Sequence, residues 1–173
     1  PLFGPNIRKN NIYGQIIKWN PNNNDHCSNL FEWSLFAMAG NPVIHNNNYA
    51  GTENIDKDNM FNSPDGLGFN KEGVLLIQTD GRYSNEGEYI GMGNNQMLCG
   101  NPITGEIKRF LVGPKECEVT GMTWSKDNKT LFVGLQHPGE RGNSHFPGGK
   151  NSVPRSSVIA INKKDGSKIT FIS

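Results

Sequence analysis

The feature that most restricts the fold of this sequence is a unit that occurs twice, at residues 64–80 and 119–136. Each copy contains an extended segment, a polar turn and a strongly apolar run, which lies at residues 75–77 in the first copy and at 131–133 in the second. Such a pattern is typical of two strands joined by a tight turn. The copies are about 55 residues apart, in the range of β-propeller blades. The sequence therefore predicts antiparallel hairpins that recur at a fixed interval.

A second kind of hairpin alternates with the first along the chain. Residues 15–23 and 96–104, and more weakly 157–166, consist of an extended apolar segment followed by Asn with Pro or Gly. Asn side chains bond to their own backbone and Gly adopts positive φ, so these residues are typical of turns. A further extended segment follows the last two copies, at 106–111 and 167–172. Two hairpins in each period predict blades of four strands.

Apolar and polar residues alternate through residues 31–35, which favours a half-buried strand over a helix there. The sequence thus predicts an all-β chain, a partial β-propeller of about two to three four-stranded blades. We expect one domain in pieces of about residues 1–62, 63–112 and 113–173. Because open sheets have unpaired edges, we expect this chain to depend on further blades.

Composition excludes several classes of protein. The chain has 17 Lys and Arg against 16 Asp and Glu and no basic stripe, which argues against nucleic-acid binding. Its longest apolar run, residues 35–39, is far shorter than a membrane span. The three cysteines form no Cys-x-x-Cys pair, so we expect buried or half-buried thiols rather than disulfides or a zinc site. The chain begins at Pro1, and we interpret it as a fragment that lacks an N-terminal part.

Two carboxylates lie near the starts of equivalent strands in the repeated unit, Asp65 in the first copy and Glu118 just before the second. In a propeller such strands line the central channel, so both side chains would converge there. Carboxylate oxygens suit calcium and also ferric iron. The alternatives are that Asp65 only caps a Pro-Asp-Gly turn and that Glu118 is a solvated charge.

Polar residues also follow the apolar strands of both copies. Asp80 comes after the first, and His137 and Glu140 come after the second. Imidazole and carboxylate groups bind metals and contact phosphate, although turn residues alone would explain the same pattern. Residues 137–156 form a long connection, which is either functional or disordered. The sequence contains no Gly-x-Ser-x-Gly elbow, P-loop or His-Glu-x-x-His motif.

Several strings resemble the C-terminal part of the PhoX-type alkaline phosphatases. The resemblance covers roughly residues 5–172, and it is the combination in this order that is specific. The strings are YGQIIKW (13–19), SPD (63–65), IQTDG (77–81), GNNQMLC (93–99) with NPITGEIKRFL (101–111), GPKECEVTG (113–121) and LQHPGE (135–140).

This resemblance implies a six-bladed propeller and an exported phosphomonoesterase, periplasmic or secreted, that releases phosphate from organic phosphate esters. It implies a calcium–iron cluster of Ca²⁺ and Fe³⁺, with an iron-binding Cys and several Glu and Arg residues in missing N-terminal blades. None of the cysteines of this chain is that ligand. The substrate would be a phosphate monoester, and the fragment alone would be inactive.

The resemblance also implies which residues of this chain bind the cluster. Asp65 and Glu118 are the first candidates, from the Ser-Pro-Asp and Glu-Val-Thr-Gly strings. Asp80, His137 and Glu140 are second candidates for metal or phosphate contacts. In one departure from the family, Gly66 follows Ser-Pro-Asp where the family often has Asn.

Two other functions are compatible with the same strands. One is a non-catalytic propeller that has lost the cluster and serves as a scaffold or binding module. The other is a calcium-dependent lactonase-like propeller, which would share the carboxylates at the strand starts but not the NNQML and QHPGE strings. A missing Cys and export signal in the N-terminal part would favour the scaffold.

Overall fold

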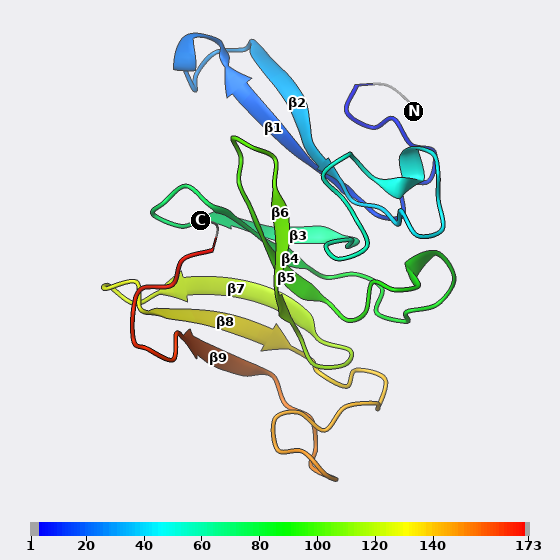
Figure 1. Ribbon diagram of the computed structural model, residues 1–173, viewed down its shortest axis with the longest axis vertical. Coiled ribbons are helices and arrows are strands. Elements are labelled where there is room, and N and C mark those ends of the chain that lie inside the picture. The colour runs from blue at the N-terminus through cyan, green and yellow to red at the C-terminus, as the bar shows by residue number, and fades with distance from the viewer. Residues whose placement is uncertain (1–3, 172–173) are drawn as a thin grey trace.

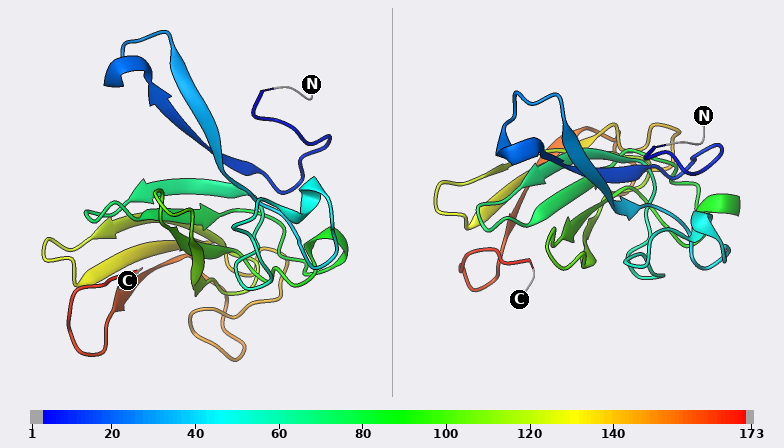
Figure 2. Two further views of the ribbon diagram at one scale, coloured as in Figure 1. Left: turned by 45° about the horizontal axis from the view of Figure 1, so that its top comes forward. Right: turned by 90° about the horizontal axis from the view of Figure 1, so that it is seen from above.

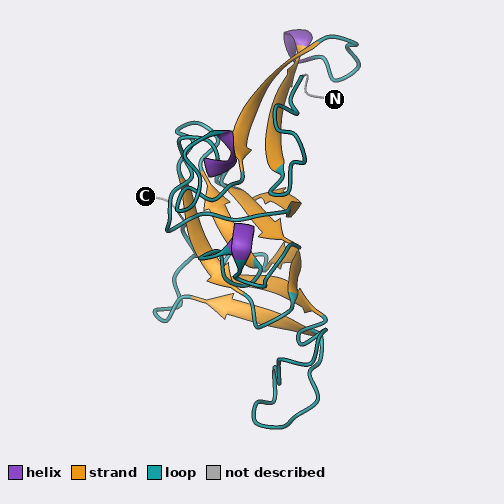
Figure 3. Cartoon of the chain, turned by 90° about the vertical axis from the view of Figure 1, so that its right-hand side faces the viewer, coloured by secondary structure: helices purple, strands orange, loops and turns teal. Residues whose placement is uncertain are grey.

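The computed structural model describes residues 4–171 and consists almost entirely of antiparallel strands (Figure 1). The strands are β1 (Gln15–Pro21), β2 (Phe31–Met38), β3 (Pro64–Phe69), β4 (Leu75–Thr79), β5 (Gln96–Gly100), β6 (Ile107–Val112), β7 (Glu118–Trp124), β8 (Thr130–Gln136) and β9 (Ser157–Asn162). Three short 3₁₀ turns, η1 (Asn22–Asn24), η2 (Asn48–Ala50) and η3 (Gly87–Tyr89), interrupt the connections between strands (Figure 3). The predicted all-β class is confirmed.

The strands form three sheets with the orders β1-β2, β3-β4-β5-β6 and β7-β8-β9. Both copies of the repeated unit fold into the predicted hairpins, β3 with β4 and β7 with β8. Within residues 4–171 the sheets do not close into a ring, so the number of blades and the three blade pieces stay predictions. No helix of the described residues is long and apolar enough to cross a membrane.

The four-stranded sheet separates two hydrophobic cores. All residues of its inner strands β4 and β5 are buried. Because successive side chains of a strand point to opposite faces, Ile77 belongs to one core and Leu76 to the other. The core that contains Leu76 is shared with β7 and β8 through Val119 and Val133. At Gly68 of β3 the terminal methyl group of Met122 in β7 occupies the space of a Cβ atom, so the two strands approach closely there.

The hairpin of β1 and β2 stands away from the other sheets (Figure 2). Residues 31–35 form a strand as predicted, but Phe31 and Trp33 are both exposed, so the expected half-burial is wrong at this end. The rings of Trp19 and Phe31 pack on each other with centroids 5.4 Å apart. The hairpin tip extends beyond the neighbouring sheet, which leaves these rings without a covering layer.

The final predicted strand is not formed. Residues 167–171 have no strand conformation, and residue 172 lies outside the described part of the chain. The segment packs through its side chains instead: Ile169 is buried, and the ring of Phe171 lies 4.8 Å from that of Phe110 and 5.7 Å from that of Trp124. Residues 167–171 are therefore held by the burial of their apolar side chains and not by backbone pairing with the edge strand β9.

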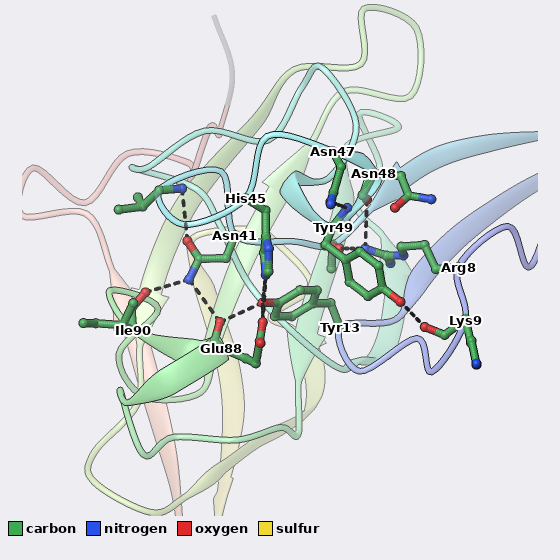
Figure 4. Close-up of polar contacts among 12 residues, drawn as sticks. Arg8, Lys9, Tyr13, Asn41, His45, Asn47, Asn48, Tyr49, Glu88 and Ile90 are labelled. Atoms are coloured by element: carbon green, nitrogen blue, oxygen red, sulfur yellow. Dashed lines mark hydrogen bonds and ion pairs between the residues drawn. The ribbon is translucent and has the colours of Figure 1, made fainter.

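A buried arginine joins the N-terminal segment to the rest of the chain (Figure 4). The guanidinium of Arg8 donates hydrogen bonds of 2.6 Å to the carbonyl oxygens of Ala39 and Gly14. The hydroxyl of Tyr13 donates to the carbonyl oxygen of Glu88 at 2.8 Å. These bonds link the N-terminal segment to the connections that precede β3 and β5, and the second of these connections contains Asp80.

The three cysteines differ in exposure, and this predicts their reactivity. Cys99 and Cys117 are buried, whereas Cys27 is exposed in the β1–β2 connection. Burial raises the pKa of Cys99, and it raises the pKa of Cys117 to about 12, so both stay as unreactive thiols near neutral pH. We expect iodoacetamide to label Cys27 in the native protein and the other two only after unfolding. Peptide mass spectrometry measures this, and native labelling of Cys117 would contradict the structure.

Candidate metal centre

Three side chains that can bind a metal meet at one end of the sheets. The ligand atoms of Asp80, Glu118 and His137 all lie within 4.8 Å of one another. Asp80 directly follows β4, His137 directly follows β8, and Glu118 is the first residue of β7. Glu118 pairs with Gln136, the last residue of β8, because the start of one antiparallel strand lies beside the end of its partner. The Nε2 atom of His137 lies 3.6 Å from Oε2 of Glu118.

A buried amide connects the segments that carry the two carboxylates. The Oδ1 atom of Asn95 accepts a hydrogen bond of 2.8 Å from the backbone N–H of Gly81, next to Asp80. Its Nδ2 atom donates to the carbonyl oxygen of Cys117, next to Glu118, at 2.9 Å. Asn95 therefore sets the distance between two segments that belong to different sheets.

His137 is held in an unusual backbone conformation. Its φ is +37°, which is uncommon for a residue other than Gly and is often found at functional sites. Its backbone N–H donates to Oγ of Ser156 at 2.9 Å. Its Nδ1 atom is buried and makes no hydrogen bond within residues 4–171. One imidazole nitrogen thus lies near Glu118, and the other is a buried polar atom that lacks a partner in this part of the chain.

This donor set fits a metal ion. Calcium prefers oxygen ligands alone, which Asp80 and Glu118 supply. Iron accepts both carboxylate and imidazole, so all three side chains suit it together. The buried Nδ1 atom of His137 is the observation that favours a further ligand interaction at this residue.

A cavity of about 470 Å³ lies beside this group. Arg82 and Arg141 both line it, and arginine suits an oxyanion such as phosphate because its guanidinium group donates paired hydrogen bonds. The residues that line it include Asp80, Arg82, Tyr83, His137, Glu140 and Arg141.

Tyr83 and Glu140 are bonded to each other in the wall of this cavity. The Tyr83 hydroxyl donates to Oε2 of Glu140 at 3.1 Å. Burial and this hydrogen bond raise the pKa of the Tyr83 hydroxyl, so it stays protonated and remains a donor. Glu140 therefore accepts from Tyr83 and is not one of the three residues that meet at the metal-ligand group.

The structure brings some of the predicted site residues together and separates others. Glu118, Asp80 and His137 form the group, and Glu140 lies in the wall of the neighbouring cavity. Asp65 is exposed on β3 and is not part of the group. The register of β3 shifts between Pro64 and Leu67, the stretch that contains Asp65. The role of Asp65 as a ligand stays a prediction.

Sequence reasoning did not assign a role to Asn95, Arg82, Tyr83 or Arg141. A usable signal existed for the arginines, since each is a charged residue shortly after a predicted ligand, Asp80 or His137. Nothing distinguishes Asn95 from the many other asparagines of this chain, because its role depends on contacts between two sheets.

Comparison with known proteins identifies the family. The chain matches the family model for alkaline phosphatase PhoX over residues 3–139. Because this match covers more than half of the chain, the chain belongs to the PhoX alkaline phosphatase family.

One solved structure that it resembles is "Pseudomonas fluorescens PhoX in complex with vanadate, a transition state analogue". The identity is 57% and the TM-score is 0.96, over 98% of this chain and 30% of that chain. This chain thus spans less than a third of the length of that protein. No curated protein matches the chain.

Proposed function

We propose that the protein of which this chain is a part is a metal-dependent phosphomonoesterase, periplasmic or secreted, that releases phosphate from organic phosphate esters. Family membership and the similarity to a PhoX bound to vanadate support this function. The observation that carries it is the group of Asp80, Glu118 and His137 beside a cavity with two arginines.

In this proposal Asp80, Glu118 and His137 hold part of a calcium–iron cluster, of Ca²⁺ and Fe³⁺. When bound, such cations neutralise phosphate oxygens and activate an oxygen nucleophile near neutral pH. The guanidinium group of Arg82 donates hydrogen bonds to oxygens of the phosphoryl group of the bound ester. Its positive charge offsets the negative charge that develops on the phosphoryl group.

The proposed whole protein is a six-bladed propeller of which this chain forms about two to three blades. The similar PhoX chain is more than three times as long, which leaves room for further blades and further ligands. The exposed apolar rings of Trp19 and Phe31 on the β1–β2 hairpin are consistent with such a neighbour. We therefore expect this fragment to be inactive by itself.

A non-catalytic scaffold is less well supported. A chain that had lost the cluster would have no need to keep two carboxylates and an imidazole within 4.8 Å of one another. Gly66, the departure from the family, packs against Gln78: a Cβ atom there would lie 2.7 Å from Oε1 of Gln78, so the Gln78 side chain would have to shift to accommodate a larger residue.

The direct test is an assay of the full-length protein with 4-nitrophenyl phosphate before and after treatment with a chelator. We expect turnover to fall by about 100-fold or more and to recover when calcium and iron are restored, because the cations supply the charge stabilisation. Turnover that persists after chelation would show that the reaction does not depend on a bound metal, which would contradict the metal part of the proposal. A protein that retains its metals and yet hydrolyses no phosphomonoester would contradict the enzyme function.

A further inference from the structure

Tyr83 and Arg141 form a wall between two neighbouring cavities. The guanidinium carbon of Arg141 lies 5.5 Å from the centre of the Tyr83 ring. Both residues line the cavity beside the metal-ligand group and also a second cavity of about 530 Å³. A planar cation therefore lies over an aromatic ring at the place where the two spaces adjoin.

A buried carboxylate holds Arg141 in this position. The Oε2 atom of Glu116 accepts hydrogen bonds from the backbone N–H groups of Arg141, at 2.8 Å, and of Asn143, at 3.2 Å. Its Oε1 atom accepts from Nδ2 of Asn143. Burial opposes ionisation of Glu116, but these three hydrogen bonds outweigh it and lower the pKa of the carboxyl group. The connection after β8 is therefore bound to the segment before β7.

A separate hydrogen bond, from the Tyr83 hydroxyl to Glu140, holds the Tyr83 ring in place. Glu140 and Arg141 are neighbours in the same connection, so the ring and the guanidinium group are both attached to it. The wall thus has a defined shape before any ligand binds, which lowers the entropic cost of binding.

We propose that Tyr83 and Arg141 contact the alcohol part of the phosphate ester and favour a planar, aromatic leaving group, and that Glu116 is the positioning residue for this contact. The inference rests on the proposed function. A phosphoryl group beside Asp80 and His137 would leave its alcohol part to extend along the cavity wall toward the second cavity. Guanidinium groups and phenol rings both stack on planar π systems, whereas an aliphatic alcohol gains little from them.

The test uses the full-length protein and the variant Arg141→Ala. We expect the KM for 4-nitrophenyl phosphate to rise by about 10-fold, which is the range of a stacking contact. The KM for glycerol phosphate and the inhibition constant for vanadate should change by less than about 2-fold, because neither has an aromatic group to stack. Arg155→Ala is the matched control, because Arg155 is exposed and lines neither cavity.

Two further variants separate stacking from a structural role. Glu116→Gln keeps the shape of the side chain but removes one acceptor, so it should reproduce the change of Arg141→Ala in the same direction. Tyr83→Phe removes the hydroxyl but keeps the ring, and it should retain the preference for the aromatic ester. If Arg141→Ala does not fold, Arg141→Lys keeps the charge without the planar group and should lose the same preference.

The outcomes that overturn the inference are distinct. An equal change for both esters and for vanadate would mean that Arg141 contacts the phosphoryl group, and unchanged constants would mean that it contacts no part of the ester. If the wild-type protein hydrolysed neither ester, the proposed function would fail first and this inference with it.

Discussion

Replacement of Glu118 by Gln is expected to reduce the turnover of a phosphomonoester by about 1000-fold, because the variant holds less tightly the cations that stabilise the negative charge of the transition state. The side chain keeps its size, but a neutral amide is a much weaker ligand for a multivalent cation. Its carboxylate oxygen lies 3.6 Å from the His137 imidazole, so the change also affects the second ligand of the group. Turnover number and bound metal, measured by elemental analysis of the full-length protein, should fall together.

Glu106→Gln is the control for this variant. Glu106 is exposed near the end of the four-stranded sheet opposite to Asp80 and pairs with Lys108 at 2.7 Å, so its replacement should leave turnover and metal content unchanged. The variant Asp65→Asn should be measured in the same experiment, because a loss of bound metal in it would support the predicted role of Asp65 in the cluster. A Glu118→Gln protein with normal metal content and normal turnover would exclude Glu118 as a ligand.

Replacement of Asn95 by Ala is expected to lower the free energy of unfolding by about 3 kcal/mol, because several buried polar groups lose their partners at once. Its Oδ1 atom accepts from Oγ1 of Thr79 at 2.9 Å and from the N–H of Gly81 at 2.8 Å. Its Nδ2 atom donates to the carbonyl oxygens of Gly81, at 3.2 Å, and of Cys117, at 2.9 Å. Urea-induced unfolding measures the change.

Asn46→Ala serves as its control, because Asn46 is exposed and its replacement should change the free energy of unfolding by less than about 0.5 kcal/mol. Asn95→Asp adds a second comparison, since it keeps the acceptor but removes both donated bonds. We also expect the Asn95 variants to bind less metal, since this amide sets the distance between the segments of Asp80 and Glu118. Equal stability of the Asn95 and Asn46 variants would contradict the role assigned to Asn95.

The local pattern of the chain was sufficient to predict its strands and the places of several site residues. The hairpins of β3 with β4 and of β7 with β8 follow from runs of apolar residues around polar turns, because contacts between neighbours in sequence form them. Asp80 and His137 were recognisable as polar residues directly after apolar strands. The family strings added the expectation of a metal site.

Which of these residues meet depends on contacts between segments distant in the sequence. Asp65 and Glu118 both lie near the starts of equivalent strands, yet only Glu118 joins Asp80 and His137. When Gly66 is aligned with Gly121, Asp65 lies two positions further along its strand than Glu118, and its side chain is exposed. The segment at 167–171 has the composition of a strand but packs on Phe110 and Trp124 instead. A sequence pattern predicts the conformation of each segment by itself. The packing of one sheet on another decides which side chains meet at the site and which residues hold them there.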